Sequence, residues 1–405
     1  MPVPVYLDHA ATSPMPEPVR IAYLDALQTA GNPSSLHSAG QSARALWEEA
    51  RTRIAATVGV DAVELTFTGG GTEAVNLAVK GLFWQSRSRS SARTRLLVPR
   101  AEHHATLDAV EWLVEHEGAR VTWLDVDAEG VLLVESVAAA LADVGADASR
   151  GADDVALITM LAANNEVGSV QPVAEVAALA AAHGVPLHVD AIAAYGQYDL
   201  SPLPVGVSAL SISAHTVGGP VGVGALALRR GTEVVPLLHG GTQQRGRSGT
   251  MDAPGAWAFA VAAEAAHAEL AERGAHKAAL RDRLEAGIRD RVPQAVLHGT
   301  GAASRLPGTV HLTVPGCEGD SLLFLVDQAG FAVSTGSACQ SGVPEPSHVL
   351  LAMGLSAADA RGALRVTIGP ATTVDEIDAL LDVLPAAVAR AEAAGLAARA
   401  PTMGR

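Results

Sequence analysis

Short apolar runs alternate with helix-forming stretches along residues 64–190, and this alternation limits the folds open to the chain. The run ELTFT (64–68) precedes TEAVNLAVKGLFW (72–84), and RLLVP (95–99) precedes ATLDAVEWLVEHEG (105–118). Strands that alternate with helices run parallel, and helices cover both faces of their sheet. The sequence therefore predicts an α/β fold with a mostly parallel central sheet, whose ligands bind at the carboxyl ends of the strands.

The pattern changes after about Gly255. A single long helical segment (256–292) leads into a mixed region, with strands predicted at TVHLTV (309–314) and ALRVTIG (363–369) and a final helix at 374–394. We therefore predict a large domain and a smaller C-terminal α+β domain that the N-terminal segment joins. The expected boundaries are 15–257 for the large domain, and 1–14 with 258–405 for the small one.

Composition and charge exclude several classes of protein. The formal net charge of −15 argues against binding nucleic acid by neutralising its phosphates. The two cysteines, Cys317 and Cys339, match no zinc-binding pattern, so no metal site is predicted. The first residues lack the basic start and apolar core of a cleavable signal, and no apolar run reaches transmembrane length. We expect a soluble cytoplasmic protein that binds neither nucleic acid nor membrane.

A glycine-rich turn lies between a predicted strand and a predicted helix in TFTGGGTEAVNLAVKG (66–81). Glycines let the backbone approach a ligand closely, and the free N–H groups at the start of a helix favour an anion. An ordinary strand–helix turn has the same composition. This motif indicates an anion site only together with other motifs.

Polar motifs follow several other predicted strands: AEHHATLD (101–108), LAANNEVGSVQP (161–172), HVDAIAAYGQ (188–197) and SAHTVGGPVGVG (213–224). A separate stretch rich in glycine and serine, STGSACQSGVPEPSHVLLAMG (334–354), carries Cys339. Free cysteine is usually buried, so a cysteine in a mobile, exposed loop indicates a chemical role. Cys317 is better interpreted as a structural thiol.

These motifs, together with GGTQQRGRSGT (240–250) and GALRVTIG (362–369), resemble those of the cysteine desulfurases in the class V aminotransferase family. The similarity runs in order from Tyr6 to about Glu376 and includes the long active-site loop of one group of these enzymes. It implies the fold of the type I enzymes that depend on pyridoxal 5'-phosphate (PLP), and L-cysteine as substrate. It also implies a sulfur-acceptor protein as partner, which could be an iron–sulfur scaffold, a tRNA-thiolating enzyme or a biosynthetic carrier.

The resemblance assigns five residues to the cofactor's phosphate and its surroundings. Gly71 and Thr72 would hold the phosphate at the helix start, with Ser213 and His215 as phosphate and ring-side contacts. Thr250 would reach the phosphate of the neighbouring subunit, which implies a homodimer.

Five further residues would act on the ring and the substrate. His103 would stack on the cofactor ring and transfer protons, and Asp190 would keep the ring nitrogen protonated. Asn165 would bind the ring hydroxyl and, with Arg365, the substrate carboxylate. Cys339 would take sulfur from L-cysteine and carry it as a persulfide.

Two positions depart from the family pattern. Thr216 occupies the place of the lysine that forms a Schiff base with PLP, and Ala193 occupies that of a glutamine that contacts the ring hydroxyl. A threonine hydroxyl cannot act as a neutral amine. Only Lys80 and Lys277 remain, and we expect Lys80 too far along its helix and Lys277 facing solvent. The expected cofactor is therefore noncovalent or absent.

Three interpretations remain open from the sequence. The chain is a desulfurase engineered to lack its lysine, or a naturally divergent sulfur carrier or partner-binding paralogue, or a protein that runs a slow or different reaction. Intact motifs favour the first interpretation, and Ala193 favours the second.

Overall fold

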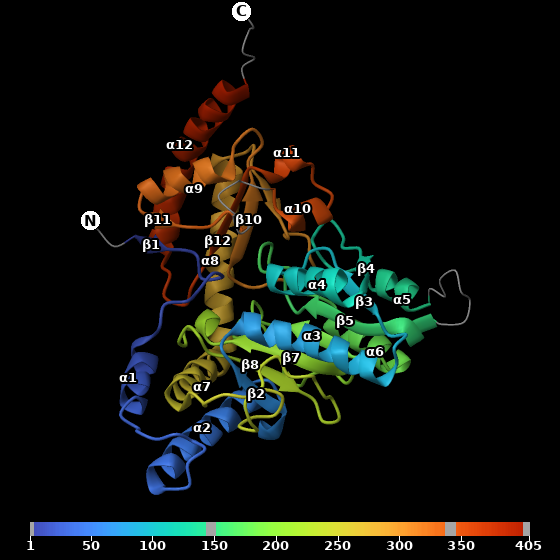
Figure 1. Cartoon of the computed structure of the whole chain (residues 1–405). Coiled ribbons are helices and arrows are strands. Elements are labelled where there is room, and N and C mark those ends of the chain that lie inside the picture. Colours follow the sequence, from blue (N-terminus) through green and yellow to red (C-terminus); the bar gives the residue numbers. More distant parts are fainter. Residues whose placement is uncertain (1–3, 143–150, 337–345, 400–405) are drawn as a thin grey trace, which may run out of the picture.

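The computed structural model describes the backbone of residues 4–142, 151–336 and 346–399 (Figure 1). A seven-stranded sheet with the order β2-β8-β7-β6-β5-β3-β4 forms the centre of the molecule. Strand β8 runs antiparallel to the other six strands of this sheet, which confirms the predicted mostly parallel α/β sheet. The strands are β2 (Leu65–Thr68), β3 (Arg95–Pro99), β4 (Arg120–Leu124), β5 (Val155–Leu161), β6 (Leu187–Asp190), β7 (Val207–Ser213) and β8 (Gly224–Leu228).

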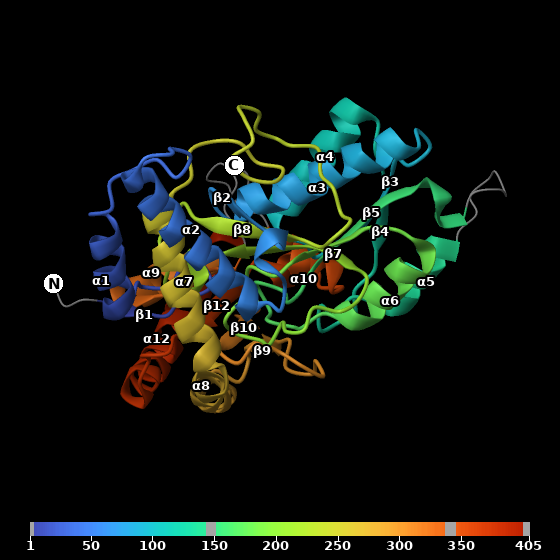
Figure 2. The same cartoon turned by 90° about the horizontal axis from the view of Figure 1, so that it is seen from below.

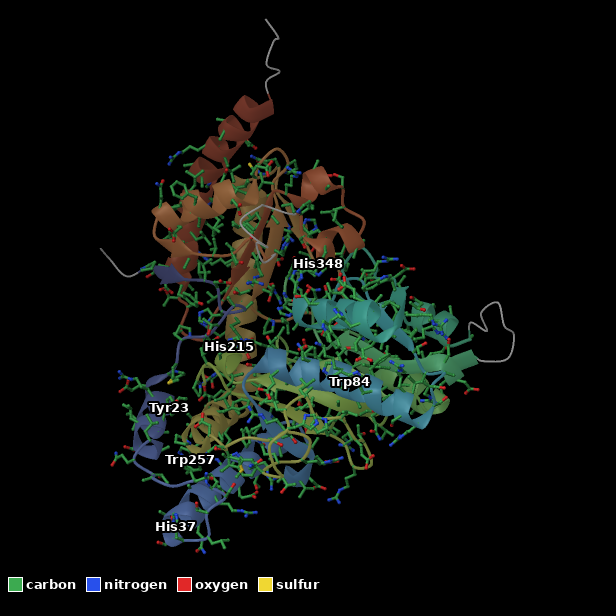
Figure 3. All side chains as sticks on the ribbon, in the orientation of Figure 1. Tyr23, His37, Trp84, His215, Trp257 and His348 are labelled. Atoms are coloured by element: carbon green, nitrogen blue, oxygen red, sulfur yellow. The ribbon has the colours of Figure 1, made fainter. Side chains whose placement is uncertain are left out.

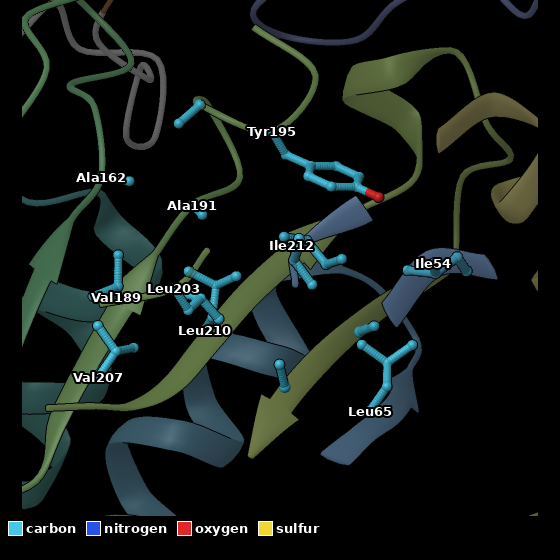
Figure 4. Close-up of a cluster of buried hydrophobic side chains, with 14 of the residues drawn as sticks. Ile54, Leu65, Ala162, Val189, Ala191, Tyr195, Leu203, Val207, Leu210 and Ile212 are labelled. Carbon is cyan, nitrogen blue, oxygen red and sulfur yellow. The ribbon is translucent and has the colours of Figure 1, made fainter. Parts of the chain in front are cut away.

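Helices cover both faces of this sheet, and Figure 2 shows α3 and α4 on one side and α5, α6 and α7 on the other. Alternate residues of a strand point to opposite faces, so Leu96 packs in the core beneath α3 and α4 while Leu97 packs in the opposite core. Figure 4 shows part of that second core. The helices are α2 (Ser38–Thr57), α3 (Gly71–Arg89), α4 (His104–Glu117), α5 (Val134–Ala142), α6 (Val173–His183) and α7 (Ala253–Ala268).

A second, smaller body has its own core around β10 (Thr309–Thr313), which pairs with β9 (Val296–His298) and β12 (Ala363–Thr367) in an antiparallel sheet. The N-terminal strand β1 (Val5–Tyr6) joins this body by pairing with β11 (Phe331–Ala332). The remaining helices are α1 (Glu17–Ala26), α8 (Leu270–Arg291), α9 (Gly319–Gln328), α10 (His348–Ala352), α11 (Ala357–Ala360) and α12 (Val374–Arg399).

The helix expected over 256–292 is two helices, so this prediction is wrong. Glu269 leaves the helical conformation at φ −101° and ψ 11°, ending α7 and preceding α8. The break separates a helix that packs on α1 and α2 of the large body from one that packs on α12 and β10 of the small body. No helix within the described ranges is long and apolar enough to cross a membrane.

Candidate functional site

The start of α3 and the end of β7 meet at the carboxyl edge of the sheet. Gly70 has φ +139°, and a Cβ added to Gly71 would lie 2.4 Å from Cδ1 of Ile192 and 3.4 Å from Cβ of Ser213. The Ser213 hydroxyl is buried without a hydrogen-bond partner among the described residues. An unpaired hydroxyl beside the N–H groups of a helix start suits a phosphate group.

The other residues expected near the phosphate lie around this helix start. Thr72 is exposed in the first turn of α3, and His215 is half-buried at the start of the 3-10 helix η3 (His215–Val217). Figure 3 labels His215 on the side of the sheet that faces the small body. Thr250 is exposed, and its loop is held near α3 by the Arg247 Nε–Glu73 Oε1 ion pair of 2.9 Å. Contact of Thr250 with a second subunit remains a prediction.

Asp190 ends β6 as a buried carboxylate, with only 2% of its surface exposed. It accepts a hydrogen bond of 3.0 Å from the Ile192 N–H. Burial raises the pKa of Asp190 from 3.8 to about 6. Glu102 is buried nearby, and burial, with the Asp190 charge, raises its pKa well above the ordinary value. A cationic ligand group at this edge would favour the ionised form of Asp190.

His103 caps the start of α4. Its Nδ1 accepts a 3.0 Å hydrogen bond from the Ala105 N–H, so the neutral ring carries its proton on Nε2. Burial of the ring and the adjacent His104 lower the pKa of His103. The imidazole therefore stays neutral at physiological pH and can donate a hydrogen bond from Nε2. His104, which the sequence left unassigned, packs edge-on against His348 with ring centroids 4.8 Å apart.

Asn164 and Asn165 have different surroundings. The Asn164 side chain accepts hydrogen bonds from the N–H groups of Glu166 and Val167 at 2.9 and 3.0 Å, so it shapes the turn. The side-chain oxygen of Asn165 is buried without a partner in the described part of the chain. Asn165 is therefore available to a ligand while Asn164 is not.

Arg365 lies on β12 of the small body and reaches the large one. Its Nη1 donates to the Asn165 carbonyl at 2.9 Å, and its Nη2 pairs with Asp8 Oδ1 at 2.9 Å. The remaining donor, Nε, is buried with no partner among the described residues. The structure thus brings Asn165 and Arg365 together although 200 residues separate them.

Cys339 lies outside the described residues, but both ends of its loop are positioned. The Ser347 hydroxyl donates to Glu166 Oε2 at 2.5 Å, and a Cβ added to Gly336 would lie 3.5 Å from the same oxygen. Both ends of the loop therefore meet at the buried Glu166, beside Asn165. His348 follows and donates from Nε2 to the Glu102 carbonyl at 2.7 Å (Figure 3).

Cys317 is 1% exposed in the small core, as a structural thiol would be. Burial raises the pKa of Cys317 to about 11. Its thiol is therefore protonated and unreactive at neutral pH.

Thr216 and Ala193 border one small cavity of about 30 Å³, together with Asn165 and Gln197. The Thr216 hydroxyl donates to the Ser213 carbonyl at 3.2 Å, so it is directed at its own turn. Both side chains are shorter than the lysine and glutamine of the family pattern. The cavity adjoins both of these shorter side chains.

Lys277 does not face solvent, and that expectation is wrong. The side chain is 2% exposed, and Nζ donates to Oε1 of Gln197. Helix α8 is rich in charged residues, so its sequence pattern suggests a solvated helix, but the small body and residues 196–197 enclose this part of it. Lys80 is placed as expected, away from the helix start, with Nζ 4.3 Å from the centre of the Trp112 ring.

Sequence reasoning missed Gln197, Glu102 and Glu166 as members of this site. Glu102 and Glu166 lie within the quoted motifs, and a glutamate inside a largely apolar strand-end motif is a usable signal. The burial of Lys277 has no such local signal.

The aminotransferase class-V family matches residues 5–380. An IscS-like cysteine desulfurase from Mycobacterium tuberculosis is 50% identical over 395 residues, which cover 97% of this chain and 98% of the relative. A cysteine desulfurase from Cereibacter sphaeroides is 41% identical over 387 residues, covering 94% and 95%.

Solved structures agree with these relatives. A NifS-like protein superposes with a TM-score of 0.85 at 31% identity, covering 96% of this chain and all of the other. A structure described as SspA in complex with cysteine has a TM-score of 0.74 at 30% identity, covering 91% and 100%.

Proposed function

This chain belongs to the class-V aminotransferase family, in its cysteine desulfurase-like group, and on that premise we propose that it binds PLP and L-cysteine at the carboxyl edge of the central sheet. Three buried polar atoms carry the proposal: Ser213 Oγ, Asn165 Oδ1 and Arg365 Nε have no partner among the described residues. Buried polar atoms normally have hydrogen-bond partners. Three unpaired atoms on residues that are expected to bind the cofactor or substrate therefore indicate a binding site.

Each residue has a defined task toward the cofactor. The N–H groups at the start of α3 and the Ser213 hydroxyl hold the phosphate, and Asp190 accepts a hydrogen bond from the protonated ring nitrogen. His103 would stack on the ring, with its Nε2–H free to donate a hydrogen bond because Nδ1 is bonded to the Ala105 N–H. When bound, PLP supplies an electron sink for reactions at the carbon that bears the amino group. Thr216 forms no covalent bond to the cofactor, so at this position the contacts to the phosphate and the ring have to hold it.

The proposed substrate site and the cysteine that accepts the sulfur are on the side of the cofactor site that faces the small body. Arg365 Nε and the Asn165 amide bind the carboxylate of L-cysteine. The thiol of Cys339 accepts the sulfur as a persulfide and passes it to an acceptor protein, while Thr250 completes the phosphate site of a second subunit in a homodimer. Glu166 accepts a hydrogen bond from Ser347 at one end of the cysteine loop and lies near Gly336 at the other end.

A second function, that of a sulfur carrier without turnover, is favoured by Thr216. Its hydroxyl is bonded to the Ser213 carbonyl and provides no amine for exchange with the substrate. An assay of the alanine and sulfide released from L-cysteine distinguishes the two functions. Turnover supports the desulfurase, and a persulfide on Cys339 from an external donor without turnover supports the carrier.

The site itself is tested by PLP binding to Ser213→Ala, measured by equilibrium dialysis. Ser208→Ala is the matched control, because Ser208 lies at the opposite end of β7 and its hydroxyl accepts a hydrogen bond of 3.2 Å from the Leu187 N–H. A hydrogen bond to a charged group contributes about 1.5–3 kcal/mol, so Ser213→Ala should weaken binding about tenfold or more. Equal affinity in the two variants, or no PLP bound by the unmodified chain, would refute the site.

A further inference from the structure

A buried amine lies close to the positions from which the family's lysine and glutamine are missing. Lys277 is 2% exposed, and its Nζ donates to the carboxamide of Gln197. Its stem packs against the small body, where a Cβ added to Gly308 would lie 3.3 Å from the lysine Cδ. Fully buried lysines without a carboxylate partner are rare, because burial disfavours the charge. The described contacts of the Lys277 Nζ include an amide but no carboxylate.

Two cavities adjoin this amine, Thr216 and Ala193. Gln197 and Thr216 border the small cavity with Asn165 and Ala193, and both also border a larger cavity of about 820 Å³. Lys277 lines that larger cavity too. Lys277 and Thr216 therefore face a common space, and Gln197 extends between them.

The ionisation of Lys277 suits a nucleophilic amine. Burial, with a smaller contribution from the positive charge of Arg273, lowers the pKa of Lys277 from 10.5 to about 8. A substantial fraction is then neutral near pH 8, and only a neutral amine attacks a carbonyl carbon. Lys80 has no such position, since it lies over Trp112 on the outer side of α3 and α4.

We propose that the Lys277–Gln197 pair replaces the amine and amide missing at positions 216 and 193, and that Lys277 Nζ bonds covalently to the aldehyde carbon of bound PLP. The carbon–nitrogen double bond forms as the carbonyl oxygen leaves in water with the two amine protons. The flexible four-carbon stem lets Nζ move from Gln197 into the common space. The short side chains of Thr216 and Ala193 leave that space open.

This inference rests on the PLP site proposed above and revises the expectation of a cofactor held without any covalent bond. That expectation assumed a solvent-facing Lys277, whereas the structure buries it. The chain has only two lysines, so the site of attachment can be assigned without ambiguity.

The test is reductive trapping in the full-length protein. The protein is incubated with PLP, reduced with borohydride, digested and mapped by mass spectrometry, alongside the matched variants Lys277→Met and Lys80→Met. We expect the adduct at Lys277 in the unmodified chain and in Lys80→Met, and its loss in Lys277→Met. Excess inorganic phosphate and Ser213→Ala should both decrease the Lys277 adduct, because each removes the cofactor from its site.

Equilibrium dialysis with PLP separates the two proposals. If PLP is retained but the adduct is missing from Lys277, or if Lys80 and Lys277 are labelled equally, the lysine inference is wrong while the cofactor site stands. If no PLP is retained, both are wrong. Mapping of the unmodified chain decides the outcome even if Lys277→Met does not fold.

Discussion

Replacing Asp190 with asparagine is expected to stabilise the cofactor-free protein at neutral pH. Asp190 is buried, and its pKa is raised from 3.8 to about 6. At about 1.4 kcal/mol per pKa unit, this change corresponds to about 3 kcal/mol of unfolding free energy. Asparagine keeps an oxygen to accept the bond from the Ile192 N–H but carries no charge.

The direction of the pH dependence follows from the two protonation states. Between about pH 4 and pH 6 the folded carboxyl still holds its proton while the unfolded one has released it, so the folded state binds more protons. The contribution of Asp190 to stability therefore falls as pH rises through this window and stays low above it. Asp190→Asn lacks this loss and should be about 3 kcal/mol more stable than the unmodified chain at pH 8. Below pH 4 the difference should vanish.

Urea unfolding without PLP, measured from pH 4 to pH 8, checks the prediction. Asp25→Asn, on the exposed face of α1, is the control and should track the unmodified chain. The Asp190 charge also raises the pKa of buried Glu102, so the difference between the curves measures the Asp190 carboxylate together with its effect on Glu102. A difference that does not change with pH, or a less stable Asp190→Asn at pH 8, would contradict the reasoning.

The same variant should bind PLP more weakly, because asparagine cannot pair as an anion with the protonated ring nitrogen. The expected loss is about tenfold or more, from a charge-assisted hydrogen bond of about 1.5–3 kcal/mol. Opposite effects on stability and on cofactor affinity would indicate a residue kept for function. Unchanged PLP affinity would mean that Asp190 does not bind the ring nitrogen.

Three further predictions concern other parts of the site. Thr216→Lys should move the borohydride adduct from Lys277 to residue 216; an adduct that stays on Lys277 would show that position 216 does not face the cofactor. In the native protein at pH 8 a thiol probe should label Cys339 and spare Cys317, because Cys317 is buried with a pKa of about 11; rapid labelling of Cys339→Ser would contradict this. Arg365→Lys should weaken L-cysteine binding about tenfold, as one ammonium cannot replace the donors that span two partners; an equal loss of PLP affinity would mean that the variant disturbs the fold.

The sequence predicted the sheet because its strands are local features. All seven residues of β5 (Val155–Leu161) are buried, and such a continuous apolar run between helices is typical of a strand covered on both faces. The sequence did not predict that β8 (Gly224–Leu228) is antiparallel, because an apolar run of five residues carries no information on the direction in which a strand runs in its sheet. Strand ends in a parallel sheet meet at one edge, and this brings Asp190 and Ser213 together. The sequence assigned both residues to one cofactor site through the family resemblance.

The sequence by itself thus determined the family motifs, the absence of lysine at position 216 and the polar residues that follow each strand. Only the tertiary structure decided that Lys277 is buried beside them. In α8 the lysine lies among charged residues, and periodicity there gives no sign of burial. Its surroundings come from Gln197, 80 residues away, and from Gly308 of the small body. Burial from such distant segments lowers the pKa of an amine that sequence reasoning placed in solvent.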